Sequence, residues 1–366
     1  METITLQMGG KLVGQGTYGC VFSTPLLTKK QHHSSHKDKN KVGKITQAID
    51  ATSEIQATTA LRSIPNSIDY FLLPDANSIS VPLPLNQQKE PDLKKCDAIE
   101  KYGFDKMLHF KITMGGPNLR QTLDTFKASA SSFPLHSFMC HLFEAGSLLT
   151  LHRYVHYDIH SGNILVGKDF VPRLIDFGVA IPIDDLTEEN LDWRWKNYAP
   201  FFSAEPPEVT LITAFTEGRN IRTSAQEIVS QKEGIVDADK LLGLQKNDQL
   251  RELLRFWQLS KTIQQRDWTL FFKMYWTKFD SWAIGSSCLK VLRRLLTFPE
   301  FQKNPQWIEH KEIIVHTLQS ILIVNPYERL DCVEALAFLD PTNAMVTGGD
   351  GAKWLGTRSV QRGTSV

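Results

Sequence analysis

The sequence has little that would place it in a membrane or attach it to a polyanion. No stretch approaches the run of about eighteen apolar residues that a membrane-spanning helix requires. The first residues, Met1–Ile4, lack the basic start and apolar run of a secretory signal. Charge of one sign is also lacking, because 41 basic side chains stand against 40 acidic ones. We therefore expect no membrane span and no general affinity for nucleic acid.

Cysteine is scarce, and its five copies are dispersed along the chain. They include no Cys-x-x-Cys pair, the spacing typical of zinc sites and redox motifs. An odd, scattered set predicts free thiols in a reducing compartment rather than a disulfide framework, and therefore a cytoplasmic protein. The five residues are Cys20, Cys96, Cys140, Cys288 and Cys332.

The first third of the chain has the pattern of an antiparallel sheet with one helix. The whole chain has 366 residues, which are enough for two lobes or domains with separate cores. The pattern predicts two short strands around a glycine-rich turn within the first twenty-odd residues, and an irregular, Pro- and Lys-rich insertion over 77–97. Further expected elements are a strand over 41–45, a helix over 48–61 and a strand over 104–114.

The remainder of the chain is predicted to be mainly helical. Phe138, Leu142, Ala145 and Leu149 recur at the spacing of one buried helix face. Two short strands are expected over 163–166 and 173–175, and a Gly-, Ser- and Thr-rich flexible tail from Asn343. A strand-rich first third followed by a helical remainder predicts an α+β fold.

A glycine-rich stretch near the start fits a phosphate-binding loop, because glycines allow backbone N–H groups to approach phosphate oxygens. A dinucleotide-binding loop is excluded, since a strand rather than a helix follows and soon reaches Pro25. An ordinary hairpin turn is the other interpretation. The stretch is Gly14, Gln15, Gly16, Thr17, Tyr18, Gly19, Cys20 and Val21.

Lys44 lies in the short apolar strand, where a half-buried ammonium requires an anionic partner. Nucleotide phosphates and a helix carboxylate would provide it. Glu54, ten residues later, is the expected carboxylate, with Asp50 one turn earlier as the alternative. A solvated surface lysine is the other interpretation.

The stretch His156–Leu165 indicates a particular chemistry more specifically than the glycine-rich stretch or Lys44 does. It sets Asp158 and Asn163 five positions apart in a loop before a strand, and Asp176 follows at the start of Asp-Phe-Gly. Phosphoryl transfer requires an acceptor for the substrate hydroxyl proton and oxygen ligands for Mg²⁺. Asp158 fits the first role, and Asn163 with Asp176 fits the second.

Together these motifs resemble the protein kinase superfamily. The resemblance implies a bilobal fold, with an N-lobe over 1–116, a C-lobe over 117–342 and the tail over 343–366. It implies that Gly14, Gly16 and Gly19 cover the ATP phosphates and that Lys44 holds them. It places Val21, Val42 and Leu165 around adenine, makes Asp158 the catalytic base, and makes Asn163 and Asp176 the Mg²⁺ ligands, with Mn²⁺ as a possible substitute.

Three later landmarks match the same family. Pro206-Pro207-Glu208 resembles the end of an activation segment, Asp280 begins the central helix, and Arg329 stands where the arginine partner of Glu208 is expected. They favour a protein kinase whose ATP- and Mg²⁺-dependent activity acts on protein Ser or Thr hydroxyls.

The chain departs from the family at three places. Tyr157 replaces the arginine that usually precedes the catalytic aspartate, so activity without activation-segment phosphorylation is expected. His160 replaces a lysine, and its loop is similar to that of aminoglycoside and other small-molecule kinases; we expect His160 to contact the γ-phosphate. The segment from about 210 to 278 is a helical insertion, interpreted as a docking element, a regulatory flap or a passive insertion.

Two other functions stay open. A small-molecule or metabolite kinase is favoured by the loop around His160, and a pseudokinase scaffold would bind without catalysis. The glycine-rich loop and the Asp-Ile-His variant also resemble kinases of large DNA viruses, which would place the protein in a host cytoplasm.

Overall fold

The computed structural model describes residues 11–16, 19–28, 40–88, 91–126, 130–192 and 197–363. Contacts divide the chain into two compact units. Unit 1 comprises the chain up to Gly115 together with Ile175–Val179, and unit 2 comprises Gly116–Leu174 and the chain from Ala180 onward.

Unit 1 is built on a four-stranded antiparallel sheet in the order β1-β2-β3-β4. At the glycine-rich turn between the first two strands, the Gly16 N–H donates to the Gly19 carbonyl oxygen at 2.9 Å. The strands are β1 (Leu12–Gln15), β2 (Gly19–Phe22), β3 (Lys41–Gln47) and β4 (Met107–Thr113). The hairpin and the third strand confirm the sequence prediction, whereas the last strand begins three residues later than expected because Phe104–Lys106 forms a 3₁₀ turn, η5.

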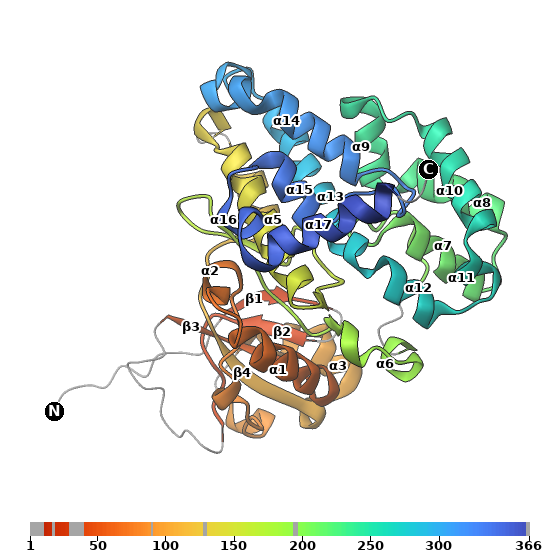
Figure 1. The fold of residues 1–366 in the computed structure, drawn as a ribbon. Helices are drawn as coiled ribbons and strands as arrows, with labels where there is room; N and C mark the ends of the chain where they lie inside the picture. Colours follow the sequence, from red (N-terminus) through yellow and green to blue (C-terminus); the bar gives the residue numbers. More distant parts are fainter. Residues whose placement is uncertain are drawn as a thin grey trace. The chain divides into compact units, whose positions relative to one another are not determined.

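Helix α1 (Ala48–Arg62) follows β3 directly and packs on β3 and β4 (Figure 1). The remaining elements of this unit are short, as expected for the irregular insertion. They are α2 (Ser67–Tyr70), η2 (Ala76–Ser78), η3 (Leu85–Gln87), η4 (Pro91–Lys95) and α3 (Asp97–Tyr102).

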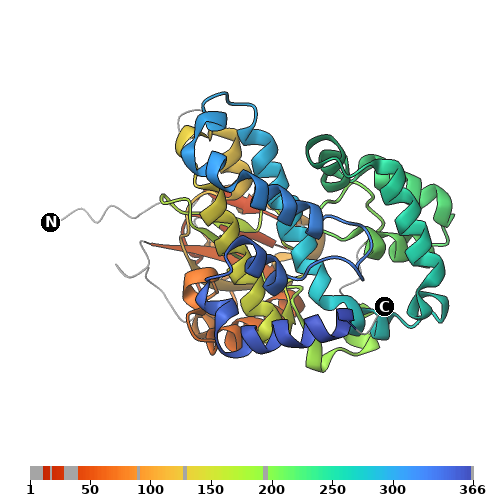
Figure 2. The same ribbon diagram turned by 45° about the horizontal axis from the view of Figure 1, so that its top comes forward.

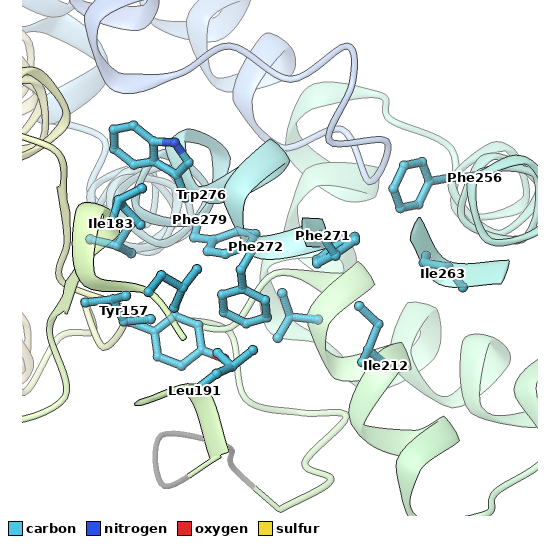
Figure 3. Close-up of a cluster of buried hydrophobic side chains, with 14 residues drawn as sticks. Tyr157, Ile183, Leu191, Ile212, Phe256, Ile263, Phe271, Phe272, Trp276 and Phe279 are labelled. Atoms are coloured by element: carbon cyan, nitrogen blue, oxygen red, sulfur yellow. The ribbon is translucent and has the colours of Figure 1, made fainter. Parts of the chain in front are cut away.

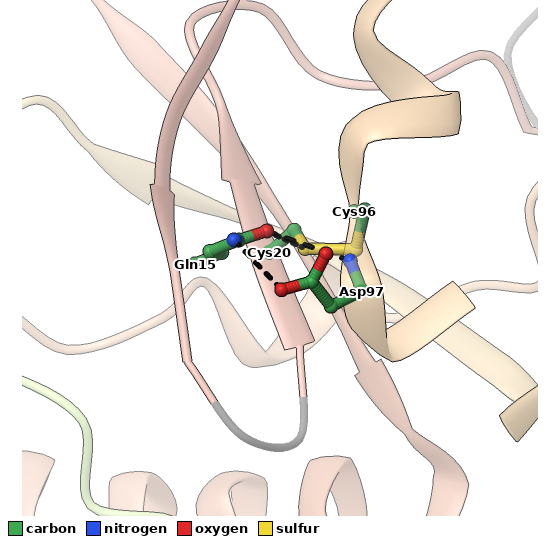
Figure 4. The surroundings of a disulfide bond; sticks show 4 residues. All are labelled: Gln15, Cys20, Cys96 and Asp97. Atoms are coloured by element: carbon green, nitrogen blue, oxygen red, sulfur yellow. Dashed lines mark hydrogen bonds between the residues drawn. A yellow bond between two sulfur atoms is a disulfide. The ribbon is translucent and has the colours of Figure 1, made fainter. Parts of the chain in front are cut away.

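The cysteine prediction was wrong for one pair. Cys20 of β2 and Cys96, just before α3, form a disulfide with Cα atoms 6.1 Å apart (Figure 4). Both belong to a buried cluster with Phe22, Ile45 and Leu93. The two positions are separated by 76 residues, so their spacing carried no signal, and only the packing of the insertion against the sheet brings them together. Cys140, Cys288 and Cys332 are free and buried.

We expect loss of this disulfide to destabilise unit 1. Cys96→Ser should lower the free energy of unfolding by about 2–4 kcal/mol, because the bond closes a long loop in the unfolded chain. Thermal unfolding with and without dithiothreitol measures the effect. The reductant should shift wild type toward the variant and leave the variant unchanged, and a wild type indifferent to reductant would contradict the prediction.

Unit 2 is mainly helical, with two small two-stranded antiparallel sheets. The first sheet pairs β5 (Tyr154–Val155) with β8 (Ile181–Pro182), and the second pairs β6 (Ile164–Val166) with β7 (Pro172–Leu174). The early helices are α4 (Leu119–Asp124), η7 (Ala130–Ser132), α5 (Leu135–Leu151), η8 (Ile183–Asp185) and α6 (Glu188–Asp192). In α5 the expected face of Phe138, Leu142, Ala145 and Leu149 is buried.

The segment 210–278 consists of helices that pack on one another and on α13. They are drawn in green and teal in Figures 1 and 2. The helices from the end of the expected activation segment are α7 (Pro207–Thr216), α8 (Ile221–Gln231), α9 (Glu233–Leu242), α10 (Lys246–Leu259), α11 (Lys261–Gln264), α12 (Trp268–Tyr275), η9 (Trp276–Lys278) and α13 (Phe279–Leu295).

The end of the chain differs from the expected flexible tail. After η10 (Phe301–Lys303), α14 (Pro305–Ile321) and α15 (Cys332–Leu339), it forms α16 (Ala344–Thr347) and α17 (Gly349–Gly363). Trp354 and Arg358 of α17 contact the Asp331 carboxylate, at 3.0 Å and 3.4 Å. These tertiary contacts order a segment whose composition alone suggested flexibility.

Candidate active site

The site in unit 1 is organised around Lys44 of β3. In the strand register, Lys44 is opposite Val21 of β2 and Phe110 of β4, so the three side chains share one face of the sheet. The Lys44 ammonium lies 2.8 Å from the Glu54 carboxylate, which confirms the expected pair. It also lies 2.7 Å from the Asp176 carboxylate.

Electrostatics keep Lys44 charged. Burial by itself lowers the pKa of Lys44, but the carboxylates of Asp176 and Glu54 more than offset it, and the pKa is raised above its ordinary value. Burial raises the pKa of Glu54 to about 7, against the opposing effect of Lys44. The pKa of Asp50 is raised to about 6, mainly by burial. Asp50, the alternative partner of Lys44, is thus half-buried nearby, while Glu54 makes the ion pair with Lys44.

Asp176 is held in an unusual backbone conformation, with φ of 67°. A left-handed conformation is uncommon for a residue with a Cβ and marks a position that the surroundings over-determine. The next side chain, Phe177, is fully buried and packs edge-to-face on Phe71, with ring centroids 5.3 Å apart. Phe177 therefore anchors the segment that presents the Asp176 carboxylate to Lys44.

The site in unit 2 is the loop between β5 and β6. The Asn163 amide donates to the carbonyl oxygen of Asp158 at 3.0 Å and to its carboxylate at 3.2 Å. The Asn163 N–H donates to the His160 carbonyl oxygen at 2.8 Å. The loop thus brings together the amide and carboxylate that the motif set five residues apart.

His160 lies beside that carboxylate. Its Nδ1 accepts from the Gly162 N–H at 3.0 Å, and its Nε2 is 3.7 Å from the Asp158 carboxylate. A Cβ on Gly162 would lie 2.7 Å from the imidazole ring, so only glycine leaves space for this ring position. With Nδ1 accepting, the assigned tautomer carries its proton on Nε2, the atom nearer Asp158.

Asp280 fixes the backbone at the start of this loop. Its buried carboxylate accepts from the N–H groups of His156 and Tyr157, at 2.7 Å and 3.0 Å. These bonds support Tyr157 at φ of 66°, another left-handed position. Asp280 was singled out from the sequence only as a helix landmark.

The Tyr157 side chain has a role that the sequence did not suggest. It is buried among aromatic residues of α12 and α13, with ring centroids 5.7 Å from Phe272 and 6.2 Å from Phe279 (Figure 3). Leu191 of α6 belongs to the same cluster. Burial raises the pKa of the Tyr157 phenol well above its ordinary value. The residue that replaces the expected arginine therefore joins the loop of Asp158 to the 210–278 helices.

The expected pair of Glu208 and Arg329 is present and fully buried. Two parallel hydrogen bonds of 2.8 Å join the guanidinium to the carboxylate, and both side chains are 0% exposed. Carbonyl oxygens of Ile323, Lys278 and Val324 accept the other Arg329 N–H groups. All five donors of the guanidinium are used.

The other predicted site residues lie in different surroundings. A Cβ at Gly19 would collide with the Ile45 carbonyl oxygen, so packing on β3 requires this glycine, whereas Gly14 and Gly16 face open space.

The Gln15 amide donates to Asp97 at 3.0 Å, which ties its side chain to α3 (Figure 4). Leu165 lies in β6 of unit 2. Thr17 and Tyr18 lie outside the described residues.

Comparison with known proteins gives one partial similarity. A 73-residue match, 20% of this chain, is 38% identical to Tyrosine-protein kinase Srms of Mus musculus, and it covers 15% of that protein's length. No family model matches the chain. The similarity indicates a kinase-like region. Within the part of the chain that the structure describes, no helix combines the length and apolar character required to cross a membrane.

Proposed function

We propose that this protein transfers the γ-phosphate of ATP to Ser or Thr hydroxyl groups of proteins. The observation that carries the proposal is the buried Lys44 ammonium, which binds carboxylates from α1 and from the Asp-Phe-Gly segment. A lysine that is kept charged in this way suits a polyphosphate ligand. The partial similarity to a protein kinase supports the same class of reaction.

The catalytic role belongs to Asp158 in this proposal. Its carboxylate accepts the proton of the substrate hydroxyl, and the Asn163 amide holds that carboxylate in place. His160, with Nε2–H on the side of Asp158, donates a hydrogen bond to the transferred phosphate.

The oxygen atoms of Asn163 and Asp176 suit Mg²⁺, which prefers hard oxygen ligands and commonly takes the remainder from phosphates and water. When bound, the cation would neutralise negative charge on the phosphates. Mn²⁺ fits the same donors. Among the described residues, no group of three or more His, Cys, Asp or Glu side chains is arranged to hold a metal ion.

The proposed acceptor is a protein rather than a small molecule. The Glu208–Arg329 pair is the landmark by which the chain resembles protein kinases, and its full burial is consistent with a structural part in unit 2. The loop around His160 remains the observation in favour of a small-molecule acceptor.

Incubation with labelled ATP and Mg²⁺ tests the proposal. We expect label on generic protein substrates, recovered as phosphoserine or phosphothreonine after acid hydrolysis, and no label with Asp176→Ala. Phosphotyrosine would contradict the Ser/Thr assignment. Label on aminoglycosides alone would contradict the protein acceptor, and absence of Mg²⁺-dependent turnover would favour a binding scaffold.

The proposed site predicts a pH dependence. Because the pKa of Glu54 is raised to about 7, chiefly by burial, its carboxyl is protonated at lower pH and loses the ion pair with Lys44. We expect kcat/KM for ATP to fall as the pH decreases through about 7, by about tenfold per unit in the limit. A profile between about pH 5.5 and about pH 8.5 measures this.

Two variants identify the titrating group. Glu54→Gln should have lower activity and no inflection near neutrality, because its amide does not titrate. Asp50→Asn should retain the inflection. An inflection that persists in Glu54→Gln would assign the titration to another group.

A further inference from the structure

The loop before α7 is held by a buried lysine of the 210–278 helices. Lys232, immediately before α9, is 0% exposed. Its ammonium donates to the carbonyl oxygens of Phe202 and Glu205, at 2.6 Å and 3.0 Å, and to the Thr210 hydroxyl at 3.1 Å. A lysine ammonium has three N–H donors, and these acceptors use all of them.

The Lys232 contacts extend to a carboxylate. The Thr210 hydroxyl, which accepts from Lys232, donates to the Glu205 carboxylate at 2.8 Å. Burial of an ammonium is costly unless such partners compensate it. An apolar side chain could fill the same space without this cost, but it could not donate the hydrogen bonds by which Lys232 holds the loop.

Residues of α9 and α13 also hold the loop at Ser203. The Trp282 indole N–H donates to the Ser203 carbonyl oxygen at 2.9 Å, and the Gly234 N–H donates to the Ser203 hydroxyl at 3.3 Å. Helix α9 is in turn attached to α13, because Arg293 forms ion pairs of 2.6 Å with Glu233 and 2.9 Å with Asp237. Hydrogen bonds therefore hold the backbone from Phe202 to Glu205 against Lys232 and α13, and ion pairs hold α9 against α13.

This loop reaches the proposed catalytic residues. The Phe202 ring packs edge-to-face on the His160 imidazole, with centroids 6.0 Å apart, and His160 lies 3.7 Å from the Asp158 carboxylate. The adjacent Phe201 side chain is 66% exposed. The loop that Lys232 holds thus presents an apolar residue to solvent next to a residue that contacts the catalytic loop.

We propose that Lys232 is a positioning residue for protein-substrate binding. It holds the backbone of residues 202–205 so that Phe202 supports His160 and Phe201 is available to an apolar side chain of the substrate. The inference rests on the proposed function and deepens it. It assigns part of the 210–278 segment a permanent role in forming the substrate-binding surface.

Steady-state kinetics of Lys232→Met test this role. We expect KM for a protein substrate to rise by about tenfold or more, while KM for ATP changes by less than about twofold. Lys240→Met is the matched control, because Lys240 lies on α9, the helix that Lys232 directly precedes, and is exposed. An unchanged protein KM in folded Lys232→Met would overturn the proposal.

A second variant and an activity-independent measurement keep the test decisive. Thr210→Val preserves the shape of the side chain but removes the hydroxyl that links Lys232 to Glu205. Amide hydrogen exchange of residues 201–205 should accelerate in both variants and not in Lys240→Met. Unchanged exchange in folded Thr210→Val would overturn the inference even if wild type is active. Faster exchange with a wild type that phosphorylates no protein would reject the proposed function and, with it, a role of this loop in substrate binding.

Discussion

Asp158→Asn is expected to lower the rate of phosphoryl transfer by about 10²–10⁴-fold, with little change in nucleotide affinity. The substitution keeps the size of the side chain but removes the proton acceptor. The neighbouring His160 does not replace it in the assigned tautomer, because Nδ1 already accepts from the Gly162 N–H. Single-turnover phosphorylation, with nucleotide affinity measured separately by calorimetry, distinguishes the chemical step from binding.

Asp184→Asn provides the control for this experiment. Asp184 is an exposed carboxylate of the same unit, in a surface ion pair of 2.6 Å with Arg153. Its loss should leave both rate and affinity within about twofold of wild type, since exposed pairs contribute little. A full rate in Asp158→Asn would contradict the assignment of the base. An equal loss of rate and affinity would point to a binding role instead.

Arg329→Met is expected to destabilise the protein by about 3–5 kcal/mol. The substitution leaves the Glu208 carboxylate buried without its guanidinium and leaves the carbonyl oxygens of Ile323 and Val324 without these donors. The cost arises chiefly from the uncompensated charge, not from the lost attraction itself. Denaturant unfolding monitored by tryptophan fluorescence measures it.

An exposed pair of the same chemistry is the comparison. Arg219 lies 2.9 Å from Glu217, but these side chains are 48% and 34% exposed. Arg219→Met should cost at most about 1 kcal/mol, because solvent already screens the pair. Equal effects of the two substitutions would refute the burial argument. A Glu208→Leu/Arg329→Met double variant should recover part of the loss, since it removes both buried charges.

Much of the site in unit 1 could be predicted because its determinants are local. Lys44 ends up next to Glu54 because a strand passes directly into a helix, and the short separation of ten positions leaves few other arrangements. The loop of Asp158 and Asn163 is equally short. The chemical types of these side chains, together with their order, therefore predicted both groups.

Other features depended on contacts between distant segments. The packing of α17 on Asp331 ordered a tail whose composition predicted flexibility. The disulfide of Cys20 and Cys96 joins positions 76 residues apart, with no spacing that marks them as partners. Tyr157 could be identified as a departure from a motif, but its aromatic partners lie on helices more than a hundred residues later.

Apart from the terminal helices α16 and α17, the sequence by itself determined the main strands and helices, the local motifs and their chemistry, because these depend on periodicity and short spacing. The tertiary structure alone decided that Lys232 is buried under the loop of Phe202, and that Asp280 supports the backbone of His156 and Tyr157. The physical reason is that burial and hydrogen-bond satisfaction are properties of the surfaces that meet. A lysine or aspartate has the same letter whether it faces solvent or is buried among its hydrogen-bond partners.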